Sequence, residues 1–180
     1  MDDEGDGSST ANNGLQSAFT FELGEGGAFT FSFDARAYLE AWSANDEVFP
    51  TAASSAYNLT FTIDDLEAGA NIVTWAPDGP GGSLGTGIVS EIDPFSLNDN
   101  VGRNAPFNGT SFRGDSEGVA FVGTWSGTTI PLLANNTYQL TIRSSAEADA
   151  REVVALPEPA TVALMGLGML GLGLSRRRRS

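Results

Sequence analysis

The sequence predicts an all-β protein, an antiparallel β-sandwich of jelly-roll type, followed by a C-terminal hydrophobic helix. Short stretches alternate apolar and polar residues with a period of two, which is typical of half-buried strands. Segments rich in Gly, Pro, Asn and Asp separate these stretches, and no convincing helical pattern precedes residue 160. Seven or eight short strands with turn signals between them favour two packed antiparallel sheets.

The chain divides by composition into an N-terminal arm, a sandwich domain and a three-part tail. The arm has no apolar periodicity, so we expect it to be flexible. The predicted segments are a flexible acidic arm (1–18), a β-sandwich domain (19–151), a linker (152–159), a hydrophobic helix (160–175) and a cytoplasmic Arg cluster (176–180).

The first part of the sandwich shows the strongest alternation. FTFEL (19–23) alternates, GEGG turns the chain, and every odd position from Phe29 to Ala41 is apolar. This pattern predicts one long strand over 29–42, bent near Asp34, with the odd side chains in the core. The similar segments FTFEL and FTFSF are interpreted as two arms of one hairpin. The side chains expected to point into the core are those of Phe29, Phe31, Phe33 and Leu39.

Weaker alternation continues through the rest of the domain. The segment 118–125 is apolar on both faces and predicts a central strand, and the alternation of 137–143 extends to Ala150. Five Gly and two Pro forbid regular structure in 76–87. The other predicted strands are 57–64, 71–75, 88–92 and 137–143. The predicted loops are 43–56, 76–87 and 93–109.

Composition excludes several classes of function. The 180 residues include 23 acidic and nine basic residues, for a net charge of −14, and every basic residue is Arg. Such a surface repels nucleic acid and anionic lipid headgroups, so we expect no nucleic-acid partner. The absence of Cys, His and Lys removes thiol nucleophiles, Cys/His zinc sites, His-based triads and Schiff-base chemistry. We therefore expect a protein that is not an enzyme.

Two sets of residues in the sandwich are candidates for binding. Asp93, Asp99 and Asn100 offer oxygen ligands to calcium, although their spacing is not that of an EF-hand, and a solvated acidic loop is the alternative. We otherwise expect no cofactor. Tyr38 and Trp42 share one face of a predicted strand and can stack on a sugar, whereas aromatic residues of a sandwich more often lie in its core. A carboxylate-dependent polysaccharide hydrolase would need two facing carboxylates, and the sequence favours no pair.

The tail has features that fit a membrane. Residues 160–175 include only two polar side chains, Thr161 and Ser175, and as a helix would reach about 24 Å, short of a hydrocarbon core of about 30 Å. The block Arg176, Arg177, Arg178 and Arg179 stays on the cytoplasmic side, which places the acidic domain outside. A buried core helix and a permanent anchor are the alternatives to a sorting signal.

The order of the tail's features resembles the PEP-CTERM sorting signal of Gram-negative bacteria. Pro157, Glu158 and Pro159 match its signature tripeptide, and the apolar stretch and the Arg block follow in the same order. The resemblance implies export, insertion into the inner membrane, recognition by an exosortase, and delivery to the cell surface or the exopolysaccharide matrix. Members of the family begin with a signal peptide, whereas residues 1–18 are acidic, so we expect the upstream reading frame to encode one.

The resemblance and the composition together predict an exported, non-enzymatic surface or matrix protein. Pro157 and Pro159 have a fixed φ and favour extended geometry in the residue before each of them. We therefore expect a rigid segment just outside the membrane that an exosortase can bind. A lectin-like module that binds polysaccharide, with or without calcium, is the first alternative. The polysaccharide hydrolase is the second.

Overall fold

The computed structural model describes residues 7–44, 51–104 and 108–152. Within these ranges every regular element is a strand and all strand pairs are antiparallel, which confirms the predicted all-β class. No helix in the described ranges is long and apolar enough to cross a membrane. The predicted helix (160–175) and the Arg cluster lie outside the described residues.

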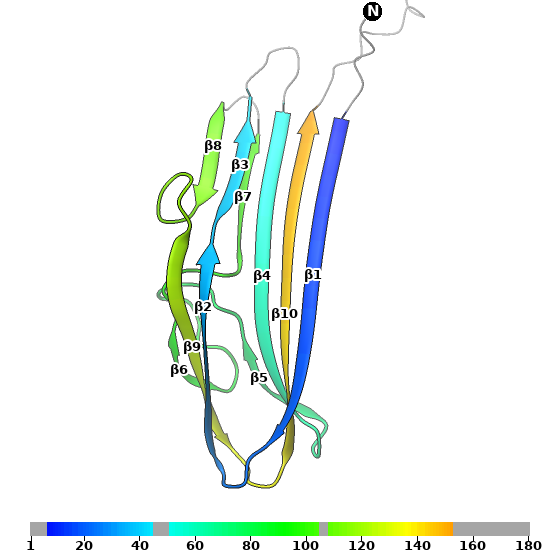
Figure 1. Cartoon of the computed structure of the whole chain (residues 1–180), viewed down its shortest axis with the longest axis vertical. Helices are drawn as coiled ribbons and strands as arrows, with labels where there is room; N and C mark the ends of the chain where they lie inside the picture. The colour runs from blue at the N-terminus through cyan, green and yellow to red at the C-terminus, as the bar shows by residue number, and fades with distance from the viewer. Residues whose placement is uncertain (1–6, 45–50, 105–107, 153–180) are drawn as a thin grey trace, which may run out of the picture.

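Ten strands make up the described part of the chain, and Figure 1 shows their arrangement. Their bounds are β1 Gly7–Glu22, β2 Gly27–Ala37, β3 Leu39–Ser43, β4 Thr51–Asp65, β5 Ala70–Trp75, β6 Ile88–Ile92, β7 Asp99–Asn104, β8 Gly109–Arg113, β9 Phe121–Leu132 and β10 Thr137–Glu152.

The strands form three sheets. Sheet A has the order β1-β10-β4-β5, with β7 also paired to β4; sheet B has the order β2-β9-β6; sheet C is the pair β3-β8. Strands β1, β10 and β4 run side by side along the full length of the molecule, whereas sheets B and C occupy different parts of that length (Figure 1). Successive strands β1 and β2 therefore lie in different sheets.

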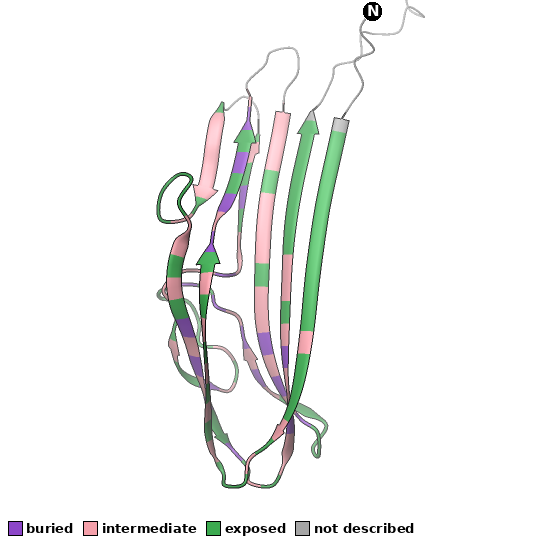
Figure 2. Cartoon of the chain, viewed as in Figure 1, coloured by how far each residue is buried: buried purple, intermediate pink, exposed green. Residues whose placement is uncertain are grey.

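Aromatic rings fill the space between sheets A and B. The ring of Phe31 in β2 lies 5.2 Å from that of Phe61 in β4 and 5.1 Å from that of Trp75 in β5. Phe33 stacks on Trp125 of β9 at 6.0 Å. Since β2 and β9 belong to sheet B and the other two strands to sheet A, these contacts hold the sheets face to face. Buried residues concentrate where sheets A and B face each other and along β3, whereas β1 is exposed over most of its length (Figure 2).

The predicted long strand over 29–42 is wrong in one respect. It is divided into β2 and β3, which pair with β9 and β8 respectively, and the break is at Tyr38 rather than near Asp34. The alternation runs through the break, since Ala37 and Leu39 are both buried, so a period of two cannot show where a strand changes partner. The core prediction is confirmed: Phe29, Phe31 and Phe33 pack against the main core, and Leu39 belongs to a second cluster with Ala41 and Val101.

The predicted flexible arm is also wrong over residues 7–18, which belong to β1. This strand pairs with β10 without a register shift from Gly7↔Glu152 to Glu22↔Thr137. Backbone hydrogen bonds to a neighbouring strand need no apolar pattern, so periodicity could not reveal this strand. The segments FTFEL and FTFSF are not arms of a hairpin either, because β1 pairs with β10 and β2 with β9.

The loops predicted over 43–56 and 93–109 contain strands. Residues 51–56 belong to β4, and β7 and the start of β8 lie within the second segment. Their small and polar residues pair through the backbone, as in β1. Among the remaining predictions, strands 71–75 and 88–92 coincide with β5 and β6, and the strand from 137 extends through the alternating alanines as β10.

Candidate functional site

The sorting tripeptide Pro157, Glu158 and Pro159 and the block Arg176–Arg179 lie outside the described residues. Their placement relative to the sheets therefore stays a prediction. In the sequence they follow β10, which is the last strand described and ends at Glu152.

Three carboxylates converge beside the aromatic core. Asp78 lies in the loop after β5, Glu91 in β6 and Asp93 directly after β6, and one carboxylate oxygen from each lies within 4.8 Å of the others. Two buried indoles face this cluster: Trp75 Nε1 donates to Glu91 Oε2 at 2.7 Å, and Trp125 Nε1 donates to Asp93 Oδ1 at 2.9 Å. The cluster therefore accepts hydrogen bonds from two core tryptophans, and Trp125 Nε1 also donates to the carbonyl oxygen of Phe95 at 2.9 Å.

Backbone donors complete the surroundings of the cluster. Gly79 N donates to Asp93 Oδ2 at 2.7 Å, and Ser83 N donates to Asp78 Oδ2 at 3.0 Å. Burial raises the pKa of the Asp93 carboxyl, and the negative charge of Asp78 raises it further, whereas the hydrogen bonds from Gly79, Asp78 and Trp125 lower it. Three carboxylates at this spacing can hold a hard cation such as calcium.

The structure does not bring the predicted calcium ligands together. Asp93 belongs to the cluster just described, whereas Asp99 is at the start of β7, where Arg113 Nε contacts its Oδ2 at 3.1 Å. The other carboxylate oxygen of Asp99 accepts a hydrogen bond from the backbone N of Asn100. Asp99 is thus engaged in an ion pair between β7 and β8, and the spacing of acidic residues along the sequence did not predict which of them would meet.

The predicted sugar contacts lie in different surroundings. The Tyr38 hydroxyl donates to Glu40 Oε2 at 2.6 Å and accepts from Gly118 N at 2.6 Å. Trp42 in β3 is 56% exposed and lines a hollow of about 400 Å³ with Ser9, Ala53, Ala150 and Arg151, whereas Tyr38 lines another hollow. The two rings therefore do not share one pocket. The other two tryptophans, Trp75 and Trp125, are core residues with 0% exposure.

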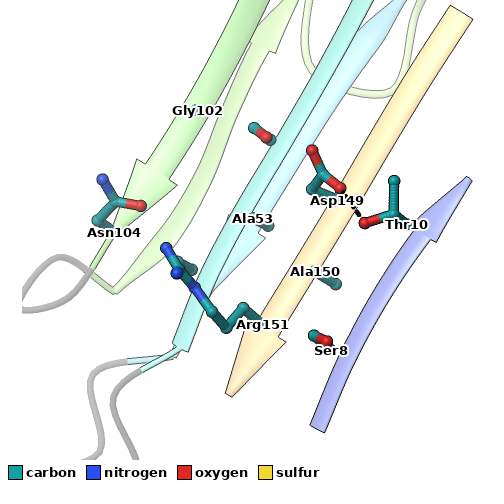
Figure 3. A pocket seen from close by; sticks show the side chains of 10 residues that line it. Ser8, Thr10, Ala53, Gly102, Asn104, Asp149, Ala150 and Arg151 are labelled. Atoms are coloured by element: carbon teal, nitrogen blue, oxygen red, sulfur yellow. Dashed lines mark hydrogen bonds between the residues drawn. The ribbon is translucent and has the colours of Figure 1, made fainter. Parts of the chain in front are cut away.

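A polar groove lies across one end of sheet A. We call it the end groove; it has a volume of about 580 Å³ and crosses β1, β10, β4 and β7. Small residues of β4, together with Gly102 and Ala150, are among those that line it. Figure 3 shows Arg151 extending from β10 over β4, and the Thr10 hydroxyl donating to Asp149 Oδ1. The polar residues that line the groove are Ser8, Thr10, Ser54, Asn104, Asp149 and Arg151.

Sequence reasoning missed Asp78, Glu91 and the end groove. Two signals for the carboxylate cluster exist in hindsight: Glu91 and Asp93 are two residues apart at the end of a strand, and a buried tryptophan requires an acceptor for its N–H. The groove had no such signal, because it depends on β7 and on the first part of β1, which were not predicted as strands. Register across four strands cannot be obtained from one sequence.

Comparison with known proteins gives a limited result for the β domain. No curated protein sequence matches the chain. Among solved structures it is similar to the infectious bursal disease virus Gt strain structure (14% identity, 96% of this chain and 48% of that chain covered, TM-score 0.14). It is also similar to the infectious bursal disease virus VP2 subviral particle (13% identity, 97% and 49% covered, TM-score 0.14). The chain spans about half the length of these proteins, and at such TM-scores the likeness carries no structural or functional conclusion.

Comparison with protein families gives a definite result for the tail. Residues 155–179 match the family model described as the PEP-CTERM protein-sorting motif. This range contains the tripeptide, the apolar stretch and the four arginines, the three features that carried the resemblance in the sequence. The chain therefore carries a PEP-CTERM sorting motif, which indicates a protein that is exported and sorted at the membrane of a Gram-negative bacterium by an exosortase.

Proposed function

We propose that the protein is a non-enzymatic component of the bacterial cell surface or of the exopolysaccharide matrix, delivered there by its tail. The observation that carries this proposal is the sorting motif at residues 155–179, which follows the β domain in the chain. The acidic composition fits an extracellular role, because net charge keeps a protein soluble and resists aggregation. In this proposal the β domain is the part that is delivered, and the tail is the sorting signal.

The tail would act through three physical steps. Residues 160–175 enter the inner membrane, since their side chains are almost all apolar. The four arginines hold the C-terminus in the cytoplasm, because moving each one through the bilayer costs at least about 2.5–3.5 kcal/mol on insertion scales. The segment Pro157-Glu158-Pro159 is then held extended at the outer face, where an exosortase acts on it.

The strand order supports the proposed jelly-roll winding of the sandwich. β1 lies beside β10 in sheet A, and the strands adjacent to them in the chain, β2 and β9, lie beside each other in sheet B. The two pairs thus pass together from one sheet to the other, as the paired strands of a jelly roll do. An experimental structure in which β2 does not pair with β9 would contradict this winding.

Cell fractionation tests the proposed destination. The full chain, fused to a secretion signal peptide, would be produced in a Gram-negative host with an exosortase and in the same host without that enzyme. We expect the protein in the surface and matrix fractions of the first host and in the inner membrane of the second. The same distribution in both hosts would contradict exosortase-dependent sorting.

A second candidate function is polysaccharide binding, and the end groove is the observation that favours it. Hydroxyl, amide, carboxylate and guanidinium groups line the groove, and these groups bind sugar hydroxyls. Exposed Trp42 lines an adjoining hollow that shares Arg151, which would add a stacking surface. Calcium would take part through the cluster of Asp78, Glu91 and Asp93 if binding depends on it.

A glycan array, with and without calcium, separates the two candidates. Binding to an array glycan that Asp149→Ala abolishes, and that the exposed turn variant Glu25→Ala leaves unchanged, would support polysaccharide binding at the groove. Binding that requires calcium and is lost in Glu91→Gln would support a role for the carboxylate cluster. If the wild-type protein binds no glycan, the structural role alone stands.

A further inference from the structure

Strand β1 is a long edge strand of sheet A. One side of β1 pairs with β10 along sixteen residues, and the other side pairs with no strand in the described ranges. Proteins usually protect such edges with short strands, charges, prolines or bulges, because an unpaired backbone is a template for another strand. The edge strands β5, β6 and β2 follow this rule: β5 and β6 have only six and five residues, and β2 carries Asp34 and Arg36. The edge of β1 has none of these protections between Gly7 and Phe21.

The charge pattern of this edge is unusual for the chain. The stretch from Gly7 to Phe21 contains no charged residue, although the protein has a net charge of −14. On β10, one strand further in, three charged side chains are hydrogen-bonded to neutral side chains of β1. These pairs are Thr10 with Asp149, Asn12 with Glu147, and Gln16 with Arg143. The edge is therefore neutral, whereas the neighbouring strand β10 carries charges of both signs.

A neutral edge favours one kind of occupant, a second copy of the same strand. When two identical strands pair around a twofold axis, the residue on the axis lies opposite itself and its neighbours lie close to their own copies. A charge near the axis would therefore face a like charge, which is destabilising. A different partner for this acidic protein would gain from complementary charge, and the edge offers none. The absence of charge over Gly7–Phe21 removes the repulsion that would otherwise oppose self-association.

Two exposed apolar side chains on β1 point in the same direction. Phe21 packs on Phe29 and Tyr138 in the core, so the odd residues of β1 face the inside of the sandwich. Leu15 and Phe19 share this face and are 67% and 56% exposed. They lie at the margin of the sheet, where a neighbouring strand in the same plane would cover them.

We propose that β1 pairs antiparallel with β1 of a second copy, with Leu15 opposite Leu15 of that copy. This register keeps odd residues beside odd residues, so the inner faces of the two copies are on the same side of one continuous sheet. Phe19 then lies opposite Ala11 of the second copy. Both exposed apolar side chains gain cross-strand neighbours, and the unpaired backbone groups of the two edges bond to each other.

Cysteine crosslinking tests the register, since the natural chain has no cysteine. The variants are Leu15→Cys and, as a matched control, Leu133→Cys, whose side chain is 65% exposed in the turn between β9 and β10. Both would be made in the full chain in detergent. Opposite residues of an antiparallel pair have Cα atoms about 4.5–5.5 Å apart, which suits a disulfide. We expect mild oxidation to convert most of the first variant, and little of the control, to a covalent dimer. Equal crosslinking, or none in the first variant, would overturn the proposal.

Sedimentation of charged variants tests the affinity. In Leu15→Arg two guanidinium groups would face each other across the axis, so we expect dimerisation to weaken by about tenfold or more. Leu133→Arg, with the same change in charge, should behave as the wild type. The tail is unchanged in all variants, so any association through the tail is common to them, and the result is independent of sorting. Identical sedimentation of the two Arg variants, with unchanged circular dichroism, would contradict the proposed interface.

Discussion

The two ends of β10 differ in what lies opposite them. At the first end Tyr138, Leu140 and Ile142 point inward, and they pack in or against the aromatic core between sheets A and B. At the other end Ala146, Ala148 and Ala150 occupy the same face of the same strand, and all three are exposed. The inward residues thus change from large to small along the strand, with the polar Ser144 between the two sets.

This difference shows that two kinds of interaction hold one sheet. Where a second sheet lies opposite, large rings are buried and apolar burial stabilises the structure. Sheet C packs against β4 and β7 at the other end and leaves the inner face of β10 exposed there; we call this part of β10 the uncovered end. Its inward residues are small, and backbone pairing of β10 with β1 and β4 continues through fifteen residues or more. Large apolar residues at the uncovered end would expose surface to water without gaining contacts.

Removing one large side chain at each end of the molecule should give the largest difference in stability. Trp75 has 0% exposure in the core, so Trp75→Ala should lower the free energy of unfolding by about 3–5 kcal/mol. Trp42, 56% exposed near the other end, is the matched control, and Trp42→Ala should change that free energy by less than about 0.5 kcal/mol. Urea denaturation followed by circular dichroism measures both. Similar losses in the two variants would mean that the ends are packed alike.

Adding one methyl group in each region should give a smaller difference in stability. A Cβ on Gly127 would lie 2.9 Å from the Phe31 ring, so Gly127→Ala should destabilise the protein by about 1–3 kcal/mol. A Cβ on Gly14 in β1 would meet nothing nearer than the Ser144 carbonyl at 3.8 Å. Gly14→Ala should therefore be neutral or stabilise by up to about 1 kcal/mol. A large loss in Gly14→Ala would show that the uncovered end is tightly packed.

The pH dependence of stability should show the smallest effect. Burial raises the pKa of Asp93, so the folded state holds this proton more tightly than the unfolded state. The resulting stability is present below the ordinary pKa of about 4 and is lost as pH rises through the raised value. The stability of the wild type relative to Asp93→Asn should therefore fall as pH increases above about 4.

Asp65 provides a control, because its contribution to stability should change with pH in the opposite direction. Hydrogen bonds from the backbone N of Ala68 and from Asn136 lower the pKa of Asp65. Its contribution is present above the ordinary pKa and is lost as pH falls, so the stability relative to Asp65→Asn should rise with pH. Denaturation curves at several pH values check both slopes. Slopes of the same sign in the two comparisons would contradict the assigned environments.

The sequence predicted the parts of the fold that are covered by a second sheet. β5 and β6 were predicted with nearly their observed bounds, and the inward direction of Phe31 and Leu39 was correct. The uncovered part of β1 was missed, because Ser, Thr, Asn and Ala pair through the backbone and leave no apolar period. Period two also could not locate the break at Tyr38, since burial alternates on both sides of it.

The candidate sites divide in the same way. The sorting motif is a linear signal, and its residues were identified from the sequence and matched by the family model. The cluster of Asp78, Glu91 and Asp93 depends on how a loop and a strand end meet beside two tryptophans, and only Asp93 was among the predicted ligands. Long-range register decides such sites, and a single sequence contains no direct record of register.

Mass spectrometry of the mature surface protein tests the central claim, that the tail directs the protein and is processed. In a native Gram-negative host with an exosortase, we expect the wild type to lack residues 160–180. Replacing Pro157 and Pro159 with Ala should leave the protein anchored and uncut, because the segment can then continue a helix. Replacing Arg176 to Arg179 with Ser should give secretion without processing, because nothing then holds the C-terminus in the cytoplasm. A wild-type surface protein that retains residues 160–180, with no effect of the Pro replacements, would show that the tail is only an anchor.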